Sequence, residues 1–476
     1  MKITKHPIRL NASANAVITN FLYLPGNNRV NNLVHRIRIL EESHVDCCLE
    51  TVMKEFAKRH RNIEQVFSNH FNKVEKLCED DLSHFSPKRK LLLGAYFTKE
   101  YSIQAAALFN PSIVAHPDQK GLKPGEKRFV MSMRATGEGH ISSIIFQTGV
   151  VDDKATIMLD QSSGYFTRLQ RKTDTVFTKL FVEKCASAIP QFNKELLNTL
   201  PETFTVSDAY QILKPKEHQE SSMIKSFMKL EEILDTNYEL ETFPDLPLNE
   251  KVIFPNARAE SRGMEDVRLV KFEDGENSSY YGTYTAYNGK DIKTQLVETK
   301  DFSEFKIRTL YGSAIQDKGM ALFPEKINGK YVMISRQGGE KMNIMFSDDL
   351  QLWENSKVLM EPQFSWELVQ LGNCGSPIKT EKGWLLLTHG VGAIRKYVIS
   401  AILLELDDPT KIIGRLDKPF IEADASEREG YVPNVVYTCG FMQHGKLLII
   451  PYALSDSAIS FVTLELDELL NEMKSQ

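Results

Sequence analysis

The chain has 476 residues, of which 42% are hydrophobic and 25% are charged. These proportions are ordinary for a folded globular protein and exclude collagen-like, disordered and disulfide-scaffold classes. The formal net charge is −5, so no general basic field attracts nucleic acid. The sequence has neither an apolar run of about 18 residues nor a signal-peptide core, so we expect no membrane partner. Six cysteines without zinc-like spacing fit reduced thiols, and we expect a cytoplasmic location.

The first part of the chain has the apolar periodicity of helices. Val45, Leu49 and Phe56 recur at helical spacing, and the pattern is interrupted near His60. We therefore predict an N-terminal helical region over residues 1–95. It contains no paired acids and no nucleophile–base set, so we expect it to make a homo-oligomer interface or to shield the rest of the chain.

From about residue 96 the pattern changes to short apolar strands separated by polar turns with glycine. A strand–turn–strand unit recurs five times, most clearly in residues 323–336, 375–390 and 432–452. A period of about 50 residues is typical of propellers built from four-stranded blades. Radial closure also protects the sheet edges. We therefore predict a mainly β fold, with a five-bladed β-propeller over residues 96–470.

One segment is longer than the repeat allows. Residues from about 150 to 247 separate the first two units, and helical periodicity is present in 177–200 and 221–238. We predict a helical insertion between the first two blades.

Polar or aromatic residues close the second strand of each unit. They could be ordinary strand ends that meet water, but five in register favour a shared pocket at one end of the propeller. These residues are Arg134, Tyr287, Arg336, His389 and Tyr452.

An acidic pair, Glu265 and Asp266, opens the apolar strand of the second unit. Charges are out of place there unless they face a polar cavity. The pair could cap a turn, or it could supply a carboxylic acid for proton transfer to a glycosidic oxygen. Lys318, Arg336 and His389 would add positive charge or fixed donors nearby. The residues alone thus indicate a polar axial pocket, in either an enzyme or a sugar-binding module.

Several motifs in the same order resemble glycoside hydrolase family 130, a family of five-bladed β-propeller enzymes that act on β-mannosides. The resemblance covers about residues 107–465. The motifs are FNPSIV (109–114), GMEDVRL (263–269), DKGMALFPEKINGKYVMISR (317–336), GNCGSPIKTEKGWLLLTHGVG (372–392) and GYVPNVVYTCG (430–440).

The resemblance implies roles for particular residues. Asp266 matches the general acid, which is expected to protonate the leaving oxygen through a sugar hydroxyl. Asn110 and Arg134 match positions that hold the mannose at the cleavage site, and Tyr287 and Asn373 are further candidates for substrate binding. The positions that match phosphate-binding residues of the family's phosphorylases are Lys318, Arg336, His389 and Tyr397.

Three departures from the phosphorylase pattern favour hydrolysis. Gln370 replaces a lysine, Gly319 replaces a common aspartate, and Tyr431 replaces another aspartate. A hydrolase needs a carboxylate base to activate water. The candidates for this base are Glu427, Glu429 and Glu367, each of which could instead be an ordinary surface residue.

We therefore expect an enzyme that cleaves β-mannosidic linkages, favouring β-1,2-linked manno-oligosaccharides, by inverting hydrolysis. The first alternative is a β-mannoside phosphorylase that releases mannose 1-phosphate. The second is a non-catalytic carbohydrate-binding propeller, which the retained acid at Asp266 argues against. No metal and no organic cofactor are implied, and inorganic phosphate would be a co-substrate only for the phosphorylase.

Overall fold

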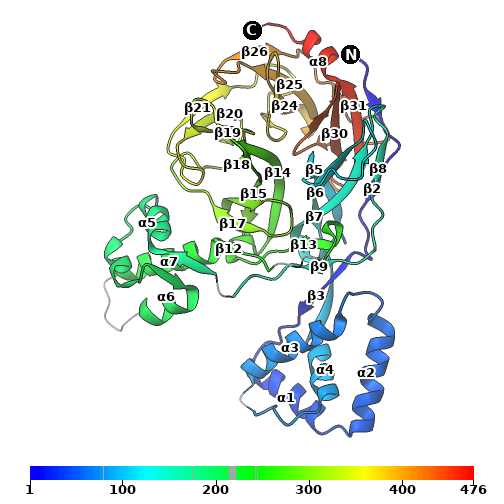
Figure 1. Ribbon diagram of the computed structural model, residues 1–476, viewed down its shortest axis with the longest axis vertical. Helices are drawn as coiled ribbons and strands as arrows, with labels where there is room; N and C mark the ends of the chain where they lie inside the picture. Colours follow the sequence, from blue (N-terminus) through cyan, green and yellow to red (C-terminus); the bar gives the residue numbers. More distant parts are fainter. Residues whose placement is uncertain (79, 174, 214–220, 242, 244, 476) are drawn as a thin grey trace.

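A computed structural model describes residues 1–475, except residues 79, 174, 214–220, 242 and 244. Sheets follow one another around the main body, one helical group extends from one end, and a second lies at the side (Figure 1). The prediction of a mainly β chain is confirmed. Within the described residues, no helix is long and apolar enough to cross a membrane.

The N-terminal residues begin with strands rather than helices, which departs from the predicted helical region. The first two strands pair with the last strand of the chain, and the third pairs with the strand that follows the helices. The helices pack around Val34, Phe71, Val74 and Leu93. The elements are β1 (Thr4–Lys5), β2 (Leu10–Asn11), β3 (Val17–Phe21), α1 (Asn27–Arg38), α2 (Glu42–Phe56), α3 (Ile63–Leu77), α4 (Pro87–Tyr96) and β4 (Thr98–Ser102).

The first two antiparallel strand groups of the main body form one extended sheet. They are joined by a single parallel pairing of Gly263 with Ser142. The first group contains β5 (Ala107–Ala115), β6 (Lys127–Thr136), β7 (Ser142–Val151) and β8 (Ile157–Leu159). The second contains β14 (Gly263–Asp274), β15 (Asn277–Tyr287), β16 (Ile292–Thr299), β17 (Lys306–Thr309) and β12 (Tyr238–Glu239), while β9 (Thr167–Arg168) and β13 (Lys251–Ile253) pair beside β7.

Three further antiparallel groups follow in chain order. The third contains β18 (Lys318–Leu322), β19 (Tyr331–Gln337), β20 (Lys341–Ser347) and β21 (Ser356–Met360). The fourth contains β22 (Gln370–Asn373), β23 (Ile378–Thr380), β24 (Gly383–Val391), β25 (Tyr397–Leu404), β26 (Ile412–Arg415) and β27 (Ile421–Glu422). The fifth contains β28 (Val436–Tyr437), β29 (Met442–His444), β30 (Leu447–Leu454) and β31 (Ala458–Glu465), and helix α8 (Leu466–Glu472) follows it.

The side group of helices lies between the first and second strand groups in the sequence. It packs around its own apolar cluster, which includes Phe177, Val182, Phe204, Leu230 and Ile233. Residues 214–220 of the predicted insertion lie outside the described residues. Its elements are β10 (Val176–Thr178), α5 (Lys179–Ser187), η2 (Lys194–Thr199), β11 (Thr203–Thr205), α6 (Val206–Leu213) and α7 (Ser221–Thr236).

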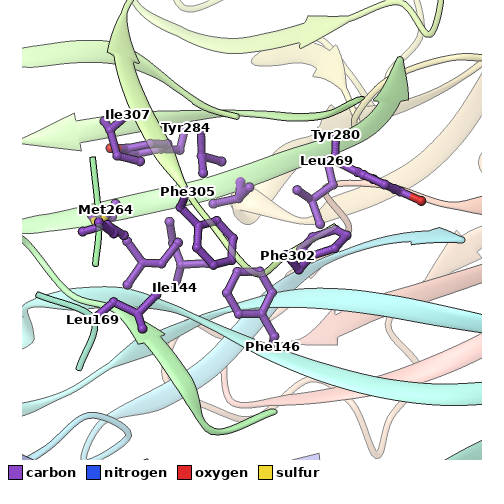
Figure 2. Packing of buried hydrophobic residues seen from close by; sticks show 14 of the residues in the cluster. Ile144, Phe146, Leu169, Met264, Leu269, Tyr280, Tyr284, Phe302, Phe305 and Ile307 are labelled. Carbon is purple, nitrogen blue, oxygen red and sulfur yellow. The ribbon is translucent and has the colours of Figure 1, made fainter. Parts of the chain in front are cut away.

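An aromatic core fixes β14 against β7 (Figure 2). The ring of Phe146 lies 5.7 Å from that of Phe305 in a stacked arrangement and 6.0 Å from that of Phe302 at a steep angle. Such offset and edge-on pairs are preferred by aromatic rings and add to the free energy gained by burial. The core therefore holds β14, the strand that carries Asp266, in a fixed position.

Candidate active site

A bulge interrupts the first strand of three successive groups at the same end of the molecule. The pairing register shifts between Phe109 and Ser112 in β5, between Glu265 and Arg268 in β14, and between Lys318 and Ala321 in β18. Within these bulges, Asn110, Asp266 and Gly319 have φ angles of 50°, 58° and 80°. Bulges redirect side chains, and left-handed backbone at residues other than glycine is costly, so such positions often mark functional sites.

Asp266 lies among positively charged and donor groups. Asn110 Nδ2 and Arg134 Nη1 donate to its Oδ1 atom at 2.7 and 3.1 Å. Burial alone would raise the pKa of Asp266, but the charges of Arg134, Arg268 and Lys318 and the Asn110 bond outweigh it and lower the pKa to about 2. Asp266 is therefore ionised at neutral pH in the free protein, which differs from the protonated general acid expected from the sequence.

Glu265 shares its cations with Asp266. Arg134 Nη2 donates to one of its oxygens at 2.9 Å, and Lys318 Nζ donates to the other at 2.7 Å. Arg134 therefore bridges both carboxylates. The structure thus brings the predicted residues Asn110, Arg134, Asp266 and Lys318 into one cluster.

Arg268 lies close to Asp266 in this cluster, and the sequence analysis did not identify it. It is buried, and it donates to Asn373 Oδ1 at 3.1 Å and to the Tyr437 hydroxyl at 2.8 Å. Asn373 Nδ2 in turn donates to the Gly319 carbonyl. The signal was present, because Arg268 lies two residues after Asp266 in the same motif, but an arginine in an apolar strand can equally face solvent.

His389 lies beside Arg336 and stacks on Tyr397. Its ring is 5.8 Å from that of Tyr397, and Nδ1 lies 3.1 Å from the Asn373 carbonyl oxygen, which requires Nδ1 to carry a proton. Burial and the neighbouring charges of Arg336 and Arg268 lower the pKa of His389 to about 3. His389 is therefore neutral and contributes no positive charge, in contrast to one expectation from the sequence.

Two glycines make room for Arg336 and His389. A Cβ atom at Gly372 would lie 2.5 Å from His389 Cε1, and one at Gly319 would lie 3.2 Å from Arg336 Cβ. The close approach at Gly319 and its φ angle of 80° therefore favour glycine at this position.

Several buried polar atoms at this end of the molecule have no hydrogen-bond partner among the described residues. They include Arg336 Nε, Arg134 Nε and Asn110 Oδ1. Buried polar groups are normally paired, so unpaired ones on residues of the Asp266 cluster and its neighbour Arg336 indicate a position for a polar ligand. Two donors and one acceptor suit an anion or a hydroxyl-rich molecule.

Asp456 is a second carboxyl group of this site that the sequence analysis missed. It follows β30 in a loop where Ser455 and Asp456 have φ angles of 46° and 50°. Burial and the negative charge of Asp266 raise the pKa of Asp456 to about 7, although Arg134 and Arg395 act in the opposite direction. The site therefore combines the ionised carboxylate of Asp266 with a carboxyl group, that of Asp456, which keeps a proton close to neutral pH.

The three candidate bases lie in other environments. Glu367 is fully buried, pairs with Arg415 at 2.5 Å and accepts two backbone N–H groups. Glu427 accepts from the Tyr452 hydroxyl at 2.7 Å and pairs with Lys5 at 2.8 Å. Glu429 is exposed. The two buried glutamates are thus already bound in structural contacts.

Tyr287 and Tyr452 also differ from the expected shared pocket. The Tyr287 hydroxyl donates to the Gly289 carbonyl in its own turn at 2.9 Å. Tyr452 is fully buried and donates to Glu427. The pattern of polar residues at the strand ends therefore identifies Arg134, Arg336 and His389 as residues of the site, but it fails for the two tyrosines.

We expect Glu367 to stabilise the fold without taking part in the reaction. Removing one partner of a buried ion pair leaves an uncompensated charge, so Glu367→Ala should lower the free energy of unfolding by about 3–5 kcal/mol. Thermal unfolding measures this change, and the milder Glu367→Gln variant should keep wild-type turnover per folded molecule. A folded but inactive Glu367→Gln variant would restore this residue as a candidate base.

Comparison with known proteins shows the family of this chain. The sequence profile of glycoside hydrolase family 130, described as beta-1,4-mannooligosaccharide phosphorylase, matches residues 215–475, more than half of the chain. The chain belongs to glycoside hydrolase family 130. The family-130 match starts after the first strand group, so Asn110 and Arg134 lie outside it and rest on their contacts with Asp266.

The curated sequence relatives of this family-130 chain are named as phosphorylases. A 1,2-beta-oligomannan phosphorylase of a Thermoanaerobacter species is 35% identical over 47% of this chain and 75% of its own length. A beta-1,2-mannobiose phosphorylase of Listeria innocua is 31% identical over 48% of this chain and 65% of its own. The solved structure of the Listeria innocua beta-1,2-mannobiose phosphorylase with beta-1,2-mannobiose is 21% identical and covers 78% of this chain and 92% of its own, with a TM-score of 0.48.

Proposed function

We propose that this protein is a β-mannoside phosphorylase that cleaves β-1,2-linked manno-oligosaccharides with inorganic phosphate and releases mannose 1-phosphate. The names of the relatives support this reaction over the hydrolysis expected from the sequence. The observation that carries it within the molecule is the unpaired Arg336 Nε, buried beside the Asp266 cluster. A fixed guanidinium donor suits a phosphate oxygen.

The contacts of the candidate base glutamates also favour phosphate over water as the acceptor of the mannosyl group. Water needs a carboxylate base, whereas phosphate brings its own negative charge to the attack. Glu367 and Glu427 are bound by Arg415 and Lys5. The missing lysine at position 370 is no obstacle, because Gln370 Nε2 lies 3.3 Å from His389 Nε2 and adds a donor at this place.

We propose that the five strand groups close into the five-bladed propeller expected from the repeats. Arg268 of the second group contacts Asn373 of the fourth and Tyr437 of the fifth. The fifth group meets the first, because Cys439 N donates to the Pro111 carbonyl at 2.7 Å. Contacts between groups far apart in sequence at one centre are what a radial arrangement requires.

The proposed reaction balances as a single displacement. A phosphate oxygen forms a bond to C1 of the terminal mannose, and the bond from C1 to the leaving oxygen breaks on the opposite face. Inversion at C1 therefore gives α-mannose 1-phosphate from a β-mannoside. The leaving oxygen takes up a proton, which we assign to Asp266 and Asp456 together, because the negative charge of Asp266 helps to keep a proton on Asp456 close to neutral pH.

This assignment predicts a pH dependence. The pKa of Asp456 is about 7, so kcat/KM should be level below that pH and should fall as Asp456 loses its proton above it. Phosphate itself titrates in the same range, so the wild-type profile is compared with that of Asp456→Asn, which cannot lose a proton there. Identical profiles would contradict a role of this carboxyl in proton supply.

The function is tested by incubating the protein with β-1,2-mannobiose over a titration of inorganic phosphate and separating the products by chromatography. We expect mannose 1-phosphate and mannose in equal amounts, formed at a rate that rises with phosphate. Free mannose alone, at a rate independent of phosphate, would instead favour the hydrolase.

We also propose a cytoplasmic location, which the six free cysteines support.

A further inference from the structure

An aromatic pair lies on two segments that adjoin the loop of Asp456 and the strand of Arg134, and it takes no part in the chemistry described above. The Tyr431 hydroxyl is 2.8 Å from His140 Nδ1, and the two rings are stacked with centroids 5.9 Å apart. Tyr431 is 44% exposed, and His140 is also exposed. A rigid, half-exposed aromatic surface beside a buried polar site is typical of a binding surface.

Hydrogen bonds attach Tyr431 to the loop that carries Asp456. Tyr431 N donates to Ser457 Oγ at 2.6 Å, and Val432 N donates to the Ser455 carbonyl at 3.0 Å. His140 ends η1 (Glu138–His140), the short helix that follows the Arg134 strand. The pair is therefore connected to Asp456 on one side and to Arg134 on the other.

The N-terminal region holds η1 in place. The Tyr101 hydroxyl of β4 donates to the Glu138 carbonyl at 2.6 Å, and Ser102 N donates to Glu138 Oε1 at 3.1 Å. A Cβ atom at Gly137 would lie 2.3 Å from the Ser102 carbonyl, so the two segments are in close contact. His140, at the end of this segment, has a left-handed backbone with a φ angle of 58°.

We propose that the Tyr431–His140 pair is a binding platform for the sugar on the leaving-group side of the bond, and that β4 of the N-terminal region positions it. The inference rests on the proposed function, because it takes the terminal mannose to occupy the buried cluster around Asp266. The remaining sugars then extend toward the exposed rim, where the apolar C–H face of a pyranose ring packs on an aromatic ring. Tyr431 thereby gains a role as a binding residue, and Tyr101 as a positioning residue.

The reverse reaction separates the two sugars. Mannose 1-phosphate and β-1,2-mannobiose are supplied as donor and acceptor, and the KM of each is measured from phosphate release. Tyr431→Ala should raise the KM of the acceptor about 3- to 10-fold, the range for an aromatic contact, and leave kcat and the KM of mannose 1-phosphate unchanged. Tyr101→Phe, which removes the bond to Glu138 and keeps the ring, should shift the acceptor KM in the same direction by a smaller factor.

Tyr23→Ala is the matched control, because this N-terminal tyrosine is 77% exposed and lies on the segment between β3 and α1. An unchanged acceptor KM in Tyr431→Ala would overturn the platform, as would an equal rise for mannose 1-phosphate. An unchanged acceptor KM in Tyr101→Phe would overturn the positioning role.

A binding measurement tests the Tyr431–His140 platform independently of the proposed function. Isothermal titration calorimetry with β-1,2-mannotriose, in the absence of phosphate, does not depend on which nucleophile the enzyme uses. We expect Tyr431→Ala to weaken binding about 3- to 10-fold even if the protein proves to be a hydrolase. Equal affinities of wild type and variant, or no binding by the wild type, would overturn the platform.

Discussion

Replacing Asp266 by asparagine should lower kcat/KM for β-1,2-mannobiose by about 10²–10⁴-fold, which is the usual contribution of a positioned acid or base. Asparagine keeps the shape of the side chain and can still contact Asn110 and Arg134. It cannot carry the negative charge that helps to keep a proton on Asp456. Steady-state kinetics on the variant, with circular dichroism to verify folding, measure the effect.

Two comparisons make this result specific. Asp348→Asn changes an exposed carboxylate that pairs with Lys330 in a surface contact, and it should keep wild-type activity. A mannoside with a good leaving group needs little protonation, so Asp266→Asn should lose less activity on it than on mannobiose. If the folded Asp266→Asn variant keeps more than about a tenth of the activity on mannobiose, Asp266 does not act on the leaving oxygen.

Replacing Arg336 by methionine should raise the KM of phosphate roughly ten- to hundredfold, because a hydrogen bond to a charged group contributes about 1.5–3 kcal/mol. The Nε atom of Arg336 has no hydrogen-bond partner among the described residues, and the residue is half-buried, so we expect its guanidinium group to donate to a phosphate oxygen. The KM of mannobiose should change little. Initial rates over a phosphate titration at saturating mannobiose measure the effect.

Lys318 provides the contrast within the same site. Its ammonium group already pairs with Glu265 at 2.7 Å, so Lys318→Met should raise the KM of phosphate less than Arg336→Met does. An equal rise in the KM of mannobiose and of phosphate for Arg336→Met would indicate that this arginine organises the whole pocket and does not bind phosphate in particular.

The strands and the central site residues could be predicted because their signals are local. Each unit repeats a strand, a turn with glycine and a second strand, and the structure forms antiparallel groups over these segments. Asn110, Asp266 and Gly319 lie in the opening motifs of their units, where the bulges occur. A charged residue within an apolar strand was a reliable indication at Asp266, because the fold surrounds it with Arg134, Arg268 and Lys318.

What could not be predicted depends on partners far away in the sequence. The strands β1 and β2 pair with β31, at the other end of the chain. No local pattern therefore distinguishes them from the start of a helical region. Glu367 and Glu427 resemble free carboxylates until the fold brings Arg415 and Lys5 to them. The neutral state of His389 likewise follows from burial and from two arginines of other strand groups.

The proposed function requires phosphate, not water, to accept the mannosyl group. Following the protein with β-1,2-mannobiose and inorganic phosphate by ³¹P nuclear magnetic resonance tests it most directly, since the spectrum reports the fate of phosphate itself. We predict that the inorganic phosphate signal decreases as a signal of α-mannose 1-phosphate grows in equal amount. An unchanged phosphate signal, while mannobiose is consumed and free mannose accumulates, would contradict the account.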